Sequence, residues 1–178
     1  RQDPDVMMIG EIRDSETAQH AVQASLTGRM VYSTLHANTT IGAVARLIDL
    51  NIERGMIAYA VRGIIAQRLV RKICPTCSEP DPAPRAEYIN FLGLQGMDIS
   101  YRRGAGCDAC KGTGYHGRTG VFEVLIFDDE LRAMIVDKAS MSELQAYAEK
   151  IGMTTLRQNA VNLVMSGMTT LDEAIRVV

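Results

Sequence analysis

The four cysteines of this chain constrain its fold more than any other feature. All of them fall into two Cys-x-x-Cys pairs, Cys74 with Cys77 and Cys107 with Cys110, in a chain of 178 residues. Each pair forms a tight turn whose sulfurs converge on one side. Two such pairs supply the four thiolates that a tetrahedral Zn²⁺ site requires. The spacing therefore predicts that two distant segments meet around a metal ion.

Other chemistry for these cysteines matches the spacing less well. Disulfides are disfavoured in the reducing cytoplasm, and a redox-active Cys-x-x-Cys motif needs only one pair. A catalytic zinc needs an open coordination position, which four cysteine ligands do not leave. The stretch from Cys107 to Gly114 also fits the CxxCxGxG repeat of DnaJ-type chaperones, but the stretch from Cys74 to Cys77 lacks the trailing glycines. A structural zinc site is the prediction.

The N-terminal stretch predicts a strand followed by a helix. The apolar run from Val6 to Ile9 has the length and composition of a strand buried on both faces of a sheet. Glu11 follows where that strand leaves the sheet, and open α/β sheets bind ligands at that edge. Asp14 can cap a helix that extends to Leu26. Strand, carboxylate and capped helix form a candidate catalytic edge.

A second apolar run, from Met30 to Leu35, also ends in a polar residue, His36. Taken singly, an acidic residue or a histidine at the end of a strand is more often a solvated or structural group. Two successive strands that both end in a group capable of chemistry favour a functional edge instead. Glu11 and His36 are therefore candidate catalytic residues.

The rest of the chain is predicted to be mainly helical, with one further strand. Apolar residues at helical spacing predict helices from Thr39 to Leu50 and from Met56 to Ile73, and a short helix from Arg85 to Leu94. The helix from Met56 to Ile73 would end in a cluster of cations: Arg68, Arg71 and Lys72. These cations would suit the negative end of its dipole, or alternatively form a subunit contact. The run from Thr119 to Phe127 predicts a strand, and only helices follow it.

Composition narrows the class of protein. Hydrophobic residues make up 47% of the chain, which is enough for a packed interior, so disorder is not expected. The net charge of −2 provides no basic stripe, so nucleic acid is not an expected partner. Arg62 and Arg68 interrupt the longest apolar run, from Met56 to Val70, which falls short of the roughly 20 residues that span a bilayer. We expect a cytoplasmic protein that meets a membrane only through partners.

With these motifs identified, the chain resembles a known family. The run RQDPDVMMIGEIRDSETAQHAVQASLTGRMVYSTLHANTT is similar to the ATPases of type II secretion and type IV pilus assembly. The stretches AVQASLTG and AQRLVRKICPTC are similar to the type II secretion branch, the E component. The resemblance covers nearly the whole chain. It implies an α/β fold: the distal part of a RecA-like P-loop ATPase core with a four-cysteine zinc-binding insert and a helical C-terminal subdomain.

The resemblance also implies roles for individual residues. In this family the GEIRD stretch is the Walker B strand, whose glutamate polarises the water that attacks the γ-phosphate of ATP. That role falls on Glu11. The histidine box of the family matches Thr27 to Asn38, with His36 as a sensor of the γ-phosphate and Arg29 where the first histidine is usual. Arg13 joins Glu11 and His36 as a nucleotide-binding residue.

The implied cofactors are ATP, Mg²⁺ and Zn²⁺. Gly10 stands before Glu11 in place of an aspartate, so Mg²⁺ is expected to be held mainly by the phosphates and a phosphate loop. No Gly-Lys pair occurs in the chain, so a GxxxxGK[ST] loop is expected upstream of Arg1, in a longer protein. Alone, the chain is expected not to hydrolyse ATP and to self-associate through apolar surface around Val6 to Ile9.

Three segments are predicted: 1–72, the distal part of the ATPase core; 73–118, the zinc-binding subdomain; and 119–178, a mainly helical subdomain. The resemblance implies a homo-hexamer in the cytoplasm, peripheral to the inner membrane, that works with inner-membrane platform proteins of a secretion or pilus machine. Two classes without ATP chemistry stay open. One is a non-catalytic, zinc-stabilised binding module that docks a membrane-platform partner, and the other is a DnaJ-type chaperone. Nucleotide hydrolysis by the intact protein separates the motor from both.

Overall fold

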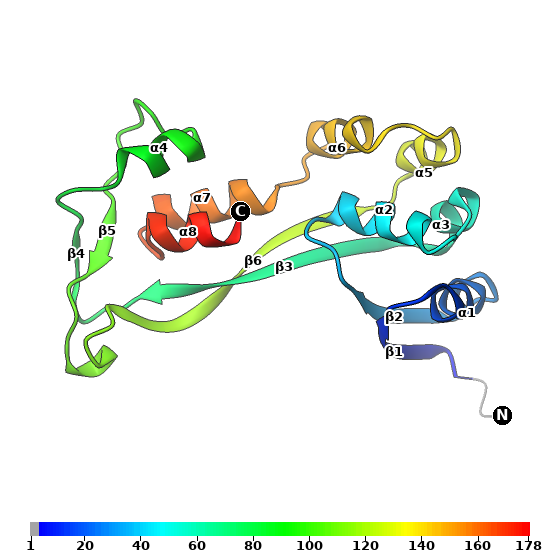
Figure 1. The fold of residues 1–178 in the computed structure, drawn as a ribbon, viewed down its shortest axis with the longest axis horizontal. Coiled ribbons are helices and arrows are strands. Elements are labelled where there is room, and N and C mark those ends of the chain that lie inside the picture. The colour runs from blue at the N-terminus through cyan, green and yellow to red at the C-terminus, as the bar shows by residue number, and fades with distance from the viewer. Residues whose placement is uncertain (1–3) are drawn as a thin grey trace. The chain divides into compact units, whose positions relative to one another are not determined.

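The computed structural model describes residues 4–178, so the first three residues of the predicted segment 1–72 lie outside it. Strands and helices follow one another along the chain, which confirms the predicted α/β class (Figure 1). In chain order the elements are β1 (Val6–Ile12), α1 (Ser15–Leu26), β2 (Met30–Leu35), α2 (Thr40–Asp49), α3 (Arg54–Ala60), β3 (Gly63–Ile73), β4 (Ser78–Pro80), α4 (Ala86–Leu92), β5 (Arg102–Gly104), the 3-10 turn η1 (Asp108–Cys110), β6 (Tyr115–Ile126), α5 (Asp129–Val136), α6 (Met141–Lys150), α7 (Leu156–Met165) and α8 (Leu171–Val177).

The chain forms two compact units, each built from two stretches of sequence. Unit 1 comprises the residues up to Ala66 together with Val124–Met153, and unit 2 comprises Gln67–Glu123 together with Thr154–Val178. The long strands β3 and β6 contribute residues to both units. The three segments predicted from the sequence divide the chain by its motifs, and this division stays a prediction.

Unit 1 begins with a strand, a helix and a strand, as predicted. β1 and β2 pair in parallel, and α1 connects them (Figure 1). Asp14 is the N-cap of α1, where its Oδ1 accepts a hydrogen bond from the Thr17 N–H at 2.8 Å. The helix ends before Gly28, whose φ of +98° is a backbone conformation that favours glycine.

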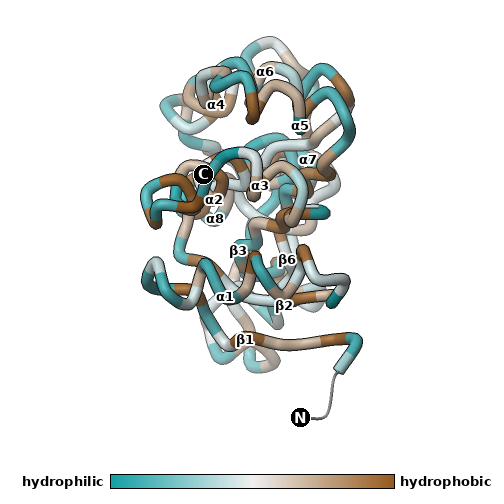
Figure 2. The backbone as a smooth tube through the Cα atoms, turned by 90° about the vertical axis from the view of Figure 1, so that its right-hand side faces the viewer, coloured by the Kyte–Doolittle hydropathy of each residue, from teal (hydrophilic) through white to brown (hydrophobic). Residues whose placement is uncertain are grey.

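The prediction that Val6 to Ile9 is buried on both faces is wrong in this chain. Side chains alternate across β1: Ile9 packs against the core, whereas Val6 and Met8 are 60% and 79% exposed. Their register partners on β2 are also exposed: Met30 and Tyr32. Among the described residues, α1 and the core cover one face of this strand pair, and the apolar side chains on the other face stay exposed. Figure 2 shows the hydrophobic residues along β1.

The predicted helix from Met56 to Ile73 is also wrong in its second half. α3 ends at Ala60, and the chain continues from Gly63 as the strand β3. From Ile64 to Val70, alternate side chains are more and less exposed, which is the period of a strand. Helical spacing and strand alternation overlap in a short apolar run, so periodicity alone did not separate them. The cations of this segment therefore lie on a strand, not at a helix terminus.

β3 pairs with β6, and hydrogen bonds mark both ends of the pair. Near one end the Phe127 N–H donates to the Arg62 carbonyl at 3.1 Å, within unit 1. At the other end the Cys74 N–H donates to the Gly114 carbonyl at 2.9 Å, within unit 2. These two contacts show that the strands are antiparallel, because the start of β3 lies beside the end of β6 and the end of β3 lies beside the start of β6. The strand predicted from Thr119 is confirmed and begins earlier, at Tyr115.

Helices supply most of the core of unit 1. Its buried apolar side chains come from α1, α2, α3, α5 and α6, from the ends of β1 and β6, and from the residues that follow α2 and β6: Ile12, Ala18, Ala21, Val22, Ile41, Val44, Leu47, Leu50, Ile52, Ile57, Ala58, Ala60, Leu125, Phe127, Leu131, Ile135, Leu144 and Ala148. Asp128 caps α5, and Ser140 and Glu143 form a capping box at the start of α6. Local capping thus starts the helices that close this core.

Unit 2 combines a short antiparallel strand pair with three helices. β4 pairs with β5, and α4, shorter than predicted, lies in the loop between the two cysteine pairs (Figure 1). α7 and α8 follow in the C-terminal stretch. Thr170 caps α8 by accepting from the Glu173 N–H at 3.3 Å. Thr170 and Glu173 have the spacing of a capping box, but the Glu173 side chain does not return the bond, so only half of that motif forms.

Glu173 instead points to β3, where its buried carboxylate forms a cluster of ion pairs with two arginines. Its side chain is 2% exposed, and its carboxylate accepts from Arg71 Nη2 at 2.7 Å and from Arg176 Nη2 at 3.0 Å. Burial by itself would raise the pKa of this carboxyl, but hydrogen bonds from Arg71 and Arg176 outweigh it and lower the pKa to about 2.

This low pKa predicts a loss of stability in acid. The folded-state pKa lies below the unfolded value, so the Glu173 carboxylate stabilises the fold above about pH 5, and that contribution disappears as pH falls towards 2. Its full size is on the order of 3 kcal/mol. In urea unfolding at pH 7, we expect Glu173→Gln to be less stable than the wild type by about that amount. The gap should narrow steadily between pH 5 and 3. A gap that is constant with pH would contradict the assignment.

Candidate active site and metal centre

Glu11 and His36 meet at the ends of the paired strands β1 and β2. The parallel register pairs Ile9 with Ser33 and then, after an irregularity, Ile12 with Leu35. The last residues of β1 therefore lie beside the end of β2. As a result, Glu11 Oε2 lies 3.3 Å from His36 Nε2. The two candidates that the strand ends predict are thus brought together by the sheet.

Arg13 completes this cluster from the other side of the carboxylate. Its Nη2 lies 2.6 Å from Glu11 Oε1. The hydrogen bond from Arg13 holds the pKa of Glu11 below its ordinary value, and the contact with His36 acts in the same direction. The carboxylate is therefore ionised at neutral pH. The side chains of Arg13 and His36 are 71% and 84% exposed, so both remain accessible to an anionic ligand such as a phosphate.

Two supporting contacts of this edge were not identified from the sequence. Thr34 Oγ1 donates to the Gly10 carbonyl at 2.8 Å, which ties β2 to the residue before Glu11. Arg46 of α2 donates through Nη2 to the Arg13 carbonyl at 3.5 Å. Thr34 lies inside an apolar run and Arg46 on an amphipathic helix, so no local signal distinguished either residue.

Arg29, at the position of the first histidine of the family's box, contacts the end of α1. Its Nη1 donates to Thr27 Oγ1 at 3.0 Å, and its backbone N–H donates to the Ala24 carbonyl at 3.2 Å. The structure thus gives Arg29 a local contact at the turn that leads into β2.

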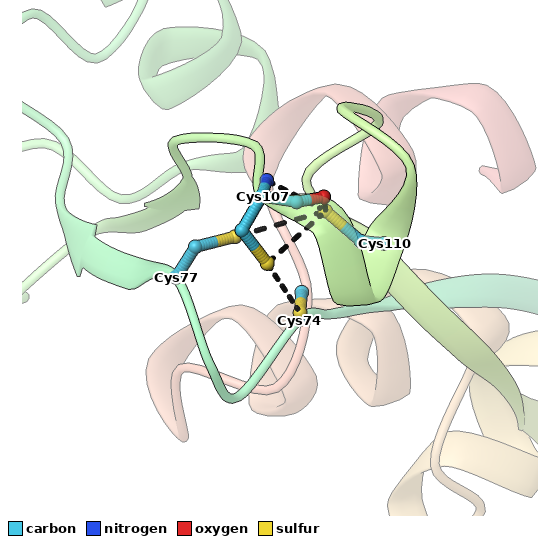
Figure 3. Close-up of side chains that lie close together, drawn as sticks. All are labelled: Cys74, Cys77, Cys107 and Cys110. Carbon is cyan, nitrogen blue, oxygen red and sulfur yellow. Dashed lines mark hydrogen bonds between the residues drawn. The ribbon is translucent and has the colours of Figure 1, made fainter.

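The four cysteines converge in unit 2 as their spacing predicts. Cys74 and Cys77 come from the turn after β3, and Cys107 and Cys110 from η1 and the residue before it. Their sulfurs point towards one another (Figure 3) and all lie within 4.8 Å of one another. Sγ–Sγ distances are 3.9 Å for Cys74 with Cys107, and 3.8 Å for Cys77 with Cys110 and for Cys107 with Cys110.

These distances fit a metal ion held by four thiolates. A tetrahedron with metal–sulfur bonds of about 2.3 Å has sulfur–sulfur edges of about 3.8 Å. Hydrogen bonds from the Cys107 N–H and the Gly114 N–H, each at 3.2 Å from Cys110 Sγ, lower the pKa of that thiol to about 6. Burial raises the pKa of the Cys77 thiol to about 12, so a cation is needed before all four sulfurs can ionise together.

Gly114 is required by the backbone around the second pair. Its φ is +76°, and a Cβ atom at this position would lie 2.5 Å from the Gly104 carbonyl oxygen. Two backbone segments therefore touch where only glycine fits, and this contact also aims the Gly114 N–H at Cys110 Sγ. Gly114 thus serves the turn that follows the second cysteine pair.

The fold and these two sites define an α/β protein with an anion-accessible carboxylate–histidine pair at a strand edge and a four-thiol metal-binding cluster. A family model described as type II/IV secretion system protein matches residues 1–176. The chain belongs to this family, which confirms the resemblance seen in its motifs.

Relatives with known names support the same membership. The chain is 46% identical to the type II secretion system protein E of Pseudomonas aeruginosa over 99% of its own length and 35% of that protein. It is 44% identical to the type IV pilus assembly ATPase PilB of Thermus thermophilus over 98% of its own length and 20% of that protein. The chain therefore spans only about a third or less of these relatives. Its relatives include ATPases of pilus assembly and proteins of type II secretion.

Solved structures agree on the fold. The pilus retraction motor PilT with bound ADP superposes with a TM-score of 0.67 at 27% identity, over 99% of this chain and 40% of PilT. The ATPase DotB of Legionella pneumophila gives a TM-score of 0.65 at 20% identity, over 99% of this chain and 39% of DotB, a likeness of fold alone. Within residues 4–178, none of the helices has the length and apolar character needed to cross a membrane.

Proposed function

We propose that this chain is the C-terminal part of a hexameric cytoplasmic ATPase motor that couples ATP hydrolysis to type II secretion or type IV pilus assembly. In this proposal residues 1–72 are the distal part of a RecA-like core. The observation that carries it is the contact between Glu11 and His36 at the ends of two parallel strands, with Arg13 on the same carboxylate. Family membership and the named ATPase relatives support it.

Glu11 is the proposed water-orienting carboxylate. Its lowered pKa keeps it ionised, so it accepts hydrogen bonds and can align a water molecule for in-line attack on a phosphate. Arg13 and His36 each occupy one oxygen of the carboxylate, which fixes its orientation while leaving further lone pairs for the water.

His36 and Arg13 are the proposed contacts to the nucleotide. Both present nitrogen donors beside Glu11, so they suit the negative oxygens of ATP and the charge that develops on transfer. ATP with Mg²⁺ supplies the phosphoryl group to be cleaved. Because Gly10 has no side chain, Mg²⁺ is proposed to be held mainly by the phosphates and by a phosphate loop outside these residues.

The four cysteines are proposed to hold one structural Zn²⁺. Four sulfur ligands leave no open position, so this metal would stabilise the fold and take no part in hydrolysis. In this proposal the motor works at the inner membrane through platform proteins of the secretion or pilus machine. The second candidate, a non-catalytic zinc-stabilised module that docks such a partner, is favoured only by the cysteine cluster.

ATP hydrolysis by the intact protein tests this function. We expect phosphate release that depends on Mg²⁺ and a slower rate for His36→Ala. A purified intact protein that assembles with its partners but never hydrolyses ATP would favour the docking module instead.

The 178-residue chain by itself is expected not to bind Mg-ATP at micromolar nucleotide. A glycine-rich loop and its lysine supply most of the attraction for the β- and γ-phosphates, and no Gly-Lys pair occurs here. The exposed apolar face of β1 and β2, with Val6 and Met8 at its centre, should also make the isolated chain self-associate. Calorimetric titration and light scattering measure the two effects. Micromolar affinity in a monomeric sample would contradict the proposed location of the nucleotide site.

A further inference from the structure

The loop between α7 and α8 runs along one edge of β3 within unit 2. The Ile73 N–H donates to the Met168 carbonyl at 2.9 Å, and Thr169 Oγ1 donates to the Arg71 carbonyl at 2.8 Å. These contacts occupy backbone groups that β3 would otherwise leave open at a strand edge. We call residues 168–176, from this loop through most of α8, the C-terminal brace.

Glu173 is the centre of the C-terminal brace. Its Oε2 accepts the Arg71 backbone N–H at 2.8 Å, and its Oε1 accepts Arg71 Nε at 3.0 Å and Nη2 at 2.7 Å. One buried carboxylate thus binds both the backbone and the side chain of the same strand residue. Arg176 extends the contact along the edge, because its Nη2 donates to the Leu69 carbonyl at 3.0 Å.

The C-terminal brace also reaches the partner strand. The Arg71 guanidinium lies 4.0 Å from the centroid of the Tyr115 ring, and the Tyr115 hydroxyl lies 2.9 Å from Thr170 Oγ1. Tyr115 is the first residue of β6, which leaves the second cysteine pair. Charge-assisted, stacking and hydroxyl contacts therefore join the C-terminal brace to both strands.

Both strands lead directly to the cysteines. Cys74 follows Ile73, whose N–H donates a hydrogen bond to the Met168 carbonyl of the C-terminal brace. Gly114 directly precedes β6, and its N–H donates to Cys110 Sγ at 3.2 Å. The contacts that hold Arg71 and Tyr115 in place therefore also restrict the backbone next to Cys74 and Cys110.

We infer that the C-terminal brace positions the four cysteines for their metal ion, with Glu173 as the positioning residue that joins α8 to β3. This inference rests on the proposed zinc site. Metal affinity depends on how much of the ligand arrangement exists before binding, and residues outside the ligand set typically change it by about 10- to 100-fold. Without the C-terminal brace, zinc binding must also order the ends of β3 and β6, and this ordering lowers the affinity for zinc.

Zinc affinity of the full-length protein tests the inference, measured by competition with a chromophoric chelator at pH 7 under reducing conditions. Glu173→Gln keeps the size and one acceptor of the side chain but removes the charge that binds the Arg71 fork. We expect its zinc dissociation constant to rise about 10-fold or more. Tyr115→Phe keeps the ring under Arg71 and removes only the hydroxyl contact. It should raise the constant by a smaller factor, and it provides a second variant if Glu173→Gln folds poorly.

Glu79→Gln is the matched control. Glu79 also binds an arginine fork, with Arg103 Nε and Nη2 at 2.9 and 2.8 Å, and it lies closer in sequence to Cys77. This pair is half exposed and belongs to β4 and β5. We expect its zinc affinity to stay within about 2-fold of wild type. An equal loss of zinc affinity in Glu79→Gln and Glu173→Gln would show that the effect comes from net charge, and it would overturn the inference.

If the C-terminal brace strengthens zinc binding, then zinc must also stabilise the C-terminal brace, because linkage between two sites is reciprocal. Removing zinc from the wild type should speed hydrogen exchange of the C-terminal brace and of the Arg71 and Ile73 amides, while the helices of unit 1 stay protected. Unchanged exchange in the C-terminal brace, or wild-type zinc affinity in both Glu173→Gln and Tyr115→Phe, would overturn the inference. A wild type that binds no zinc would instead refute the metal site itself.

Discussion

Glu11→Gln in the intact protein is expected to lower ATP turnover by about 100-fold or more while nucleotide binding is kept. The amide is the same size as the carboxylate, so the strand edge should not change. It carries no negative charge, however, and so cannot orient a water in the role proposed for Glu11. Arg13 would also lose its ion pair, since its Nη2 lies 2.6 Å from the carboxylate.

Steady-state phosphate release and equilibrium binding of a fluorescent nucleotide measure the two parts of this prediction. Glu16→Gln is the control, because Glu16 is an exposed carboxylate in the first turn of α1, near the same strand edge. It should leave turnover close to wild type. A normal hydrolysis rate in Glu11→Gln would show that the Walker B assignment is wrong.

Loss of the metal is expected to have the largest effect on stability. Apparent binding free energies of structural zinc in small domains are on the order of 10 kcal/mol, and this energy contributes directly to folding. Elemental analysis of metal-replete protein should find about one zinc per chain, because the four sulfurs form a single cluster. Chelation under reducing conditions should lower the melting temperature of unit 2 markedly.

Cys107→Ser separates local from global effects of the metal. It removes one sulfur from the cluster and should loosen the segment from Cys74 to Gly117. Glu11 and His36 belong to unit 1 and should keep their contact. Limited proteolysis of the variant should therefore cut first between the cysteine pairs. A zinc-free protein with reduced cysteines and an unchanged melting curve would rule out a structural metal.

Short motifs carry the residues of both candidate sites, so local signals were enough to predict which side chains would meet. The Cys-x-x-Cys spacing predicts that four sulfurs converge, and the structure brings them within 4.8 Å of one another. Residues such as Asp14 and Ser140 act on amides three positions away, so the helix starts could be predicted without knowledge of the fold. Successive strands that end in Glu11 and His36 predicted a shared edge, and the parallel pairing places Glu11 Oε2 3.3 Å from His36 Nε2.

The sequence misled where two periodicities overlap or where burial depends on neighbours. The run from Met56 to Ile73 matches a helix by spacing, but pairing with β6 decides that its second half is a strand. Likewise, the apolar run from Val6 to Ile9 suits a strand buried on both faces and a strand buried on one face. Only the placement of α1 shows which face is covered. Such outcomes depend on residues far away in the chain.

By itself, then, the sequence determined the α/β class, the helix caps, the cysteine cluster and the family. Only the tertiary structure decided that Glu173 turns away from its own helix start to bind Arg71. The physical reason is range. A cap or a cysteine turn is satisfied within a few residues, whereas Glu173 and Arg71 are separated by 102 positions and meet only because α8 packs beside β3.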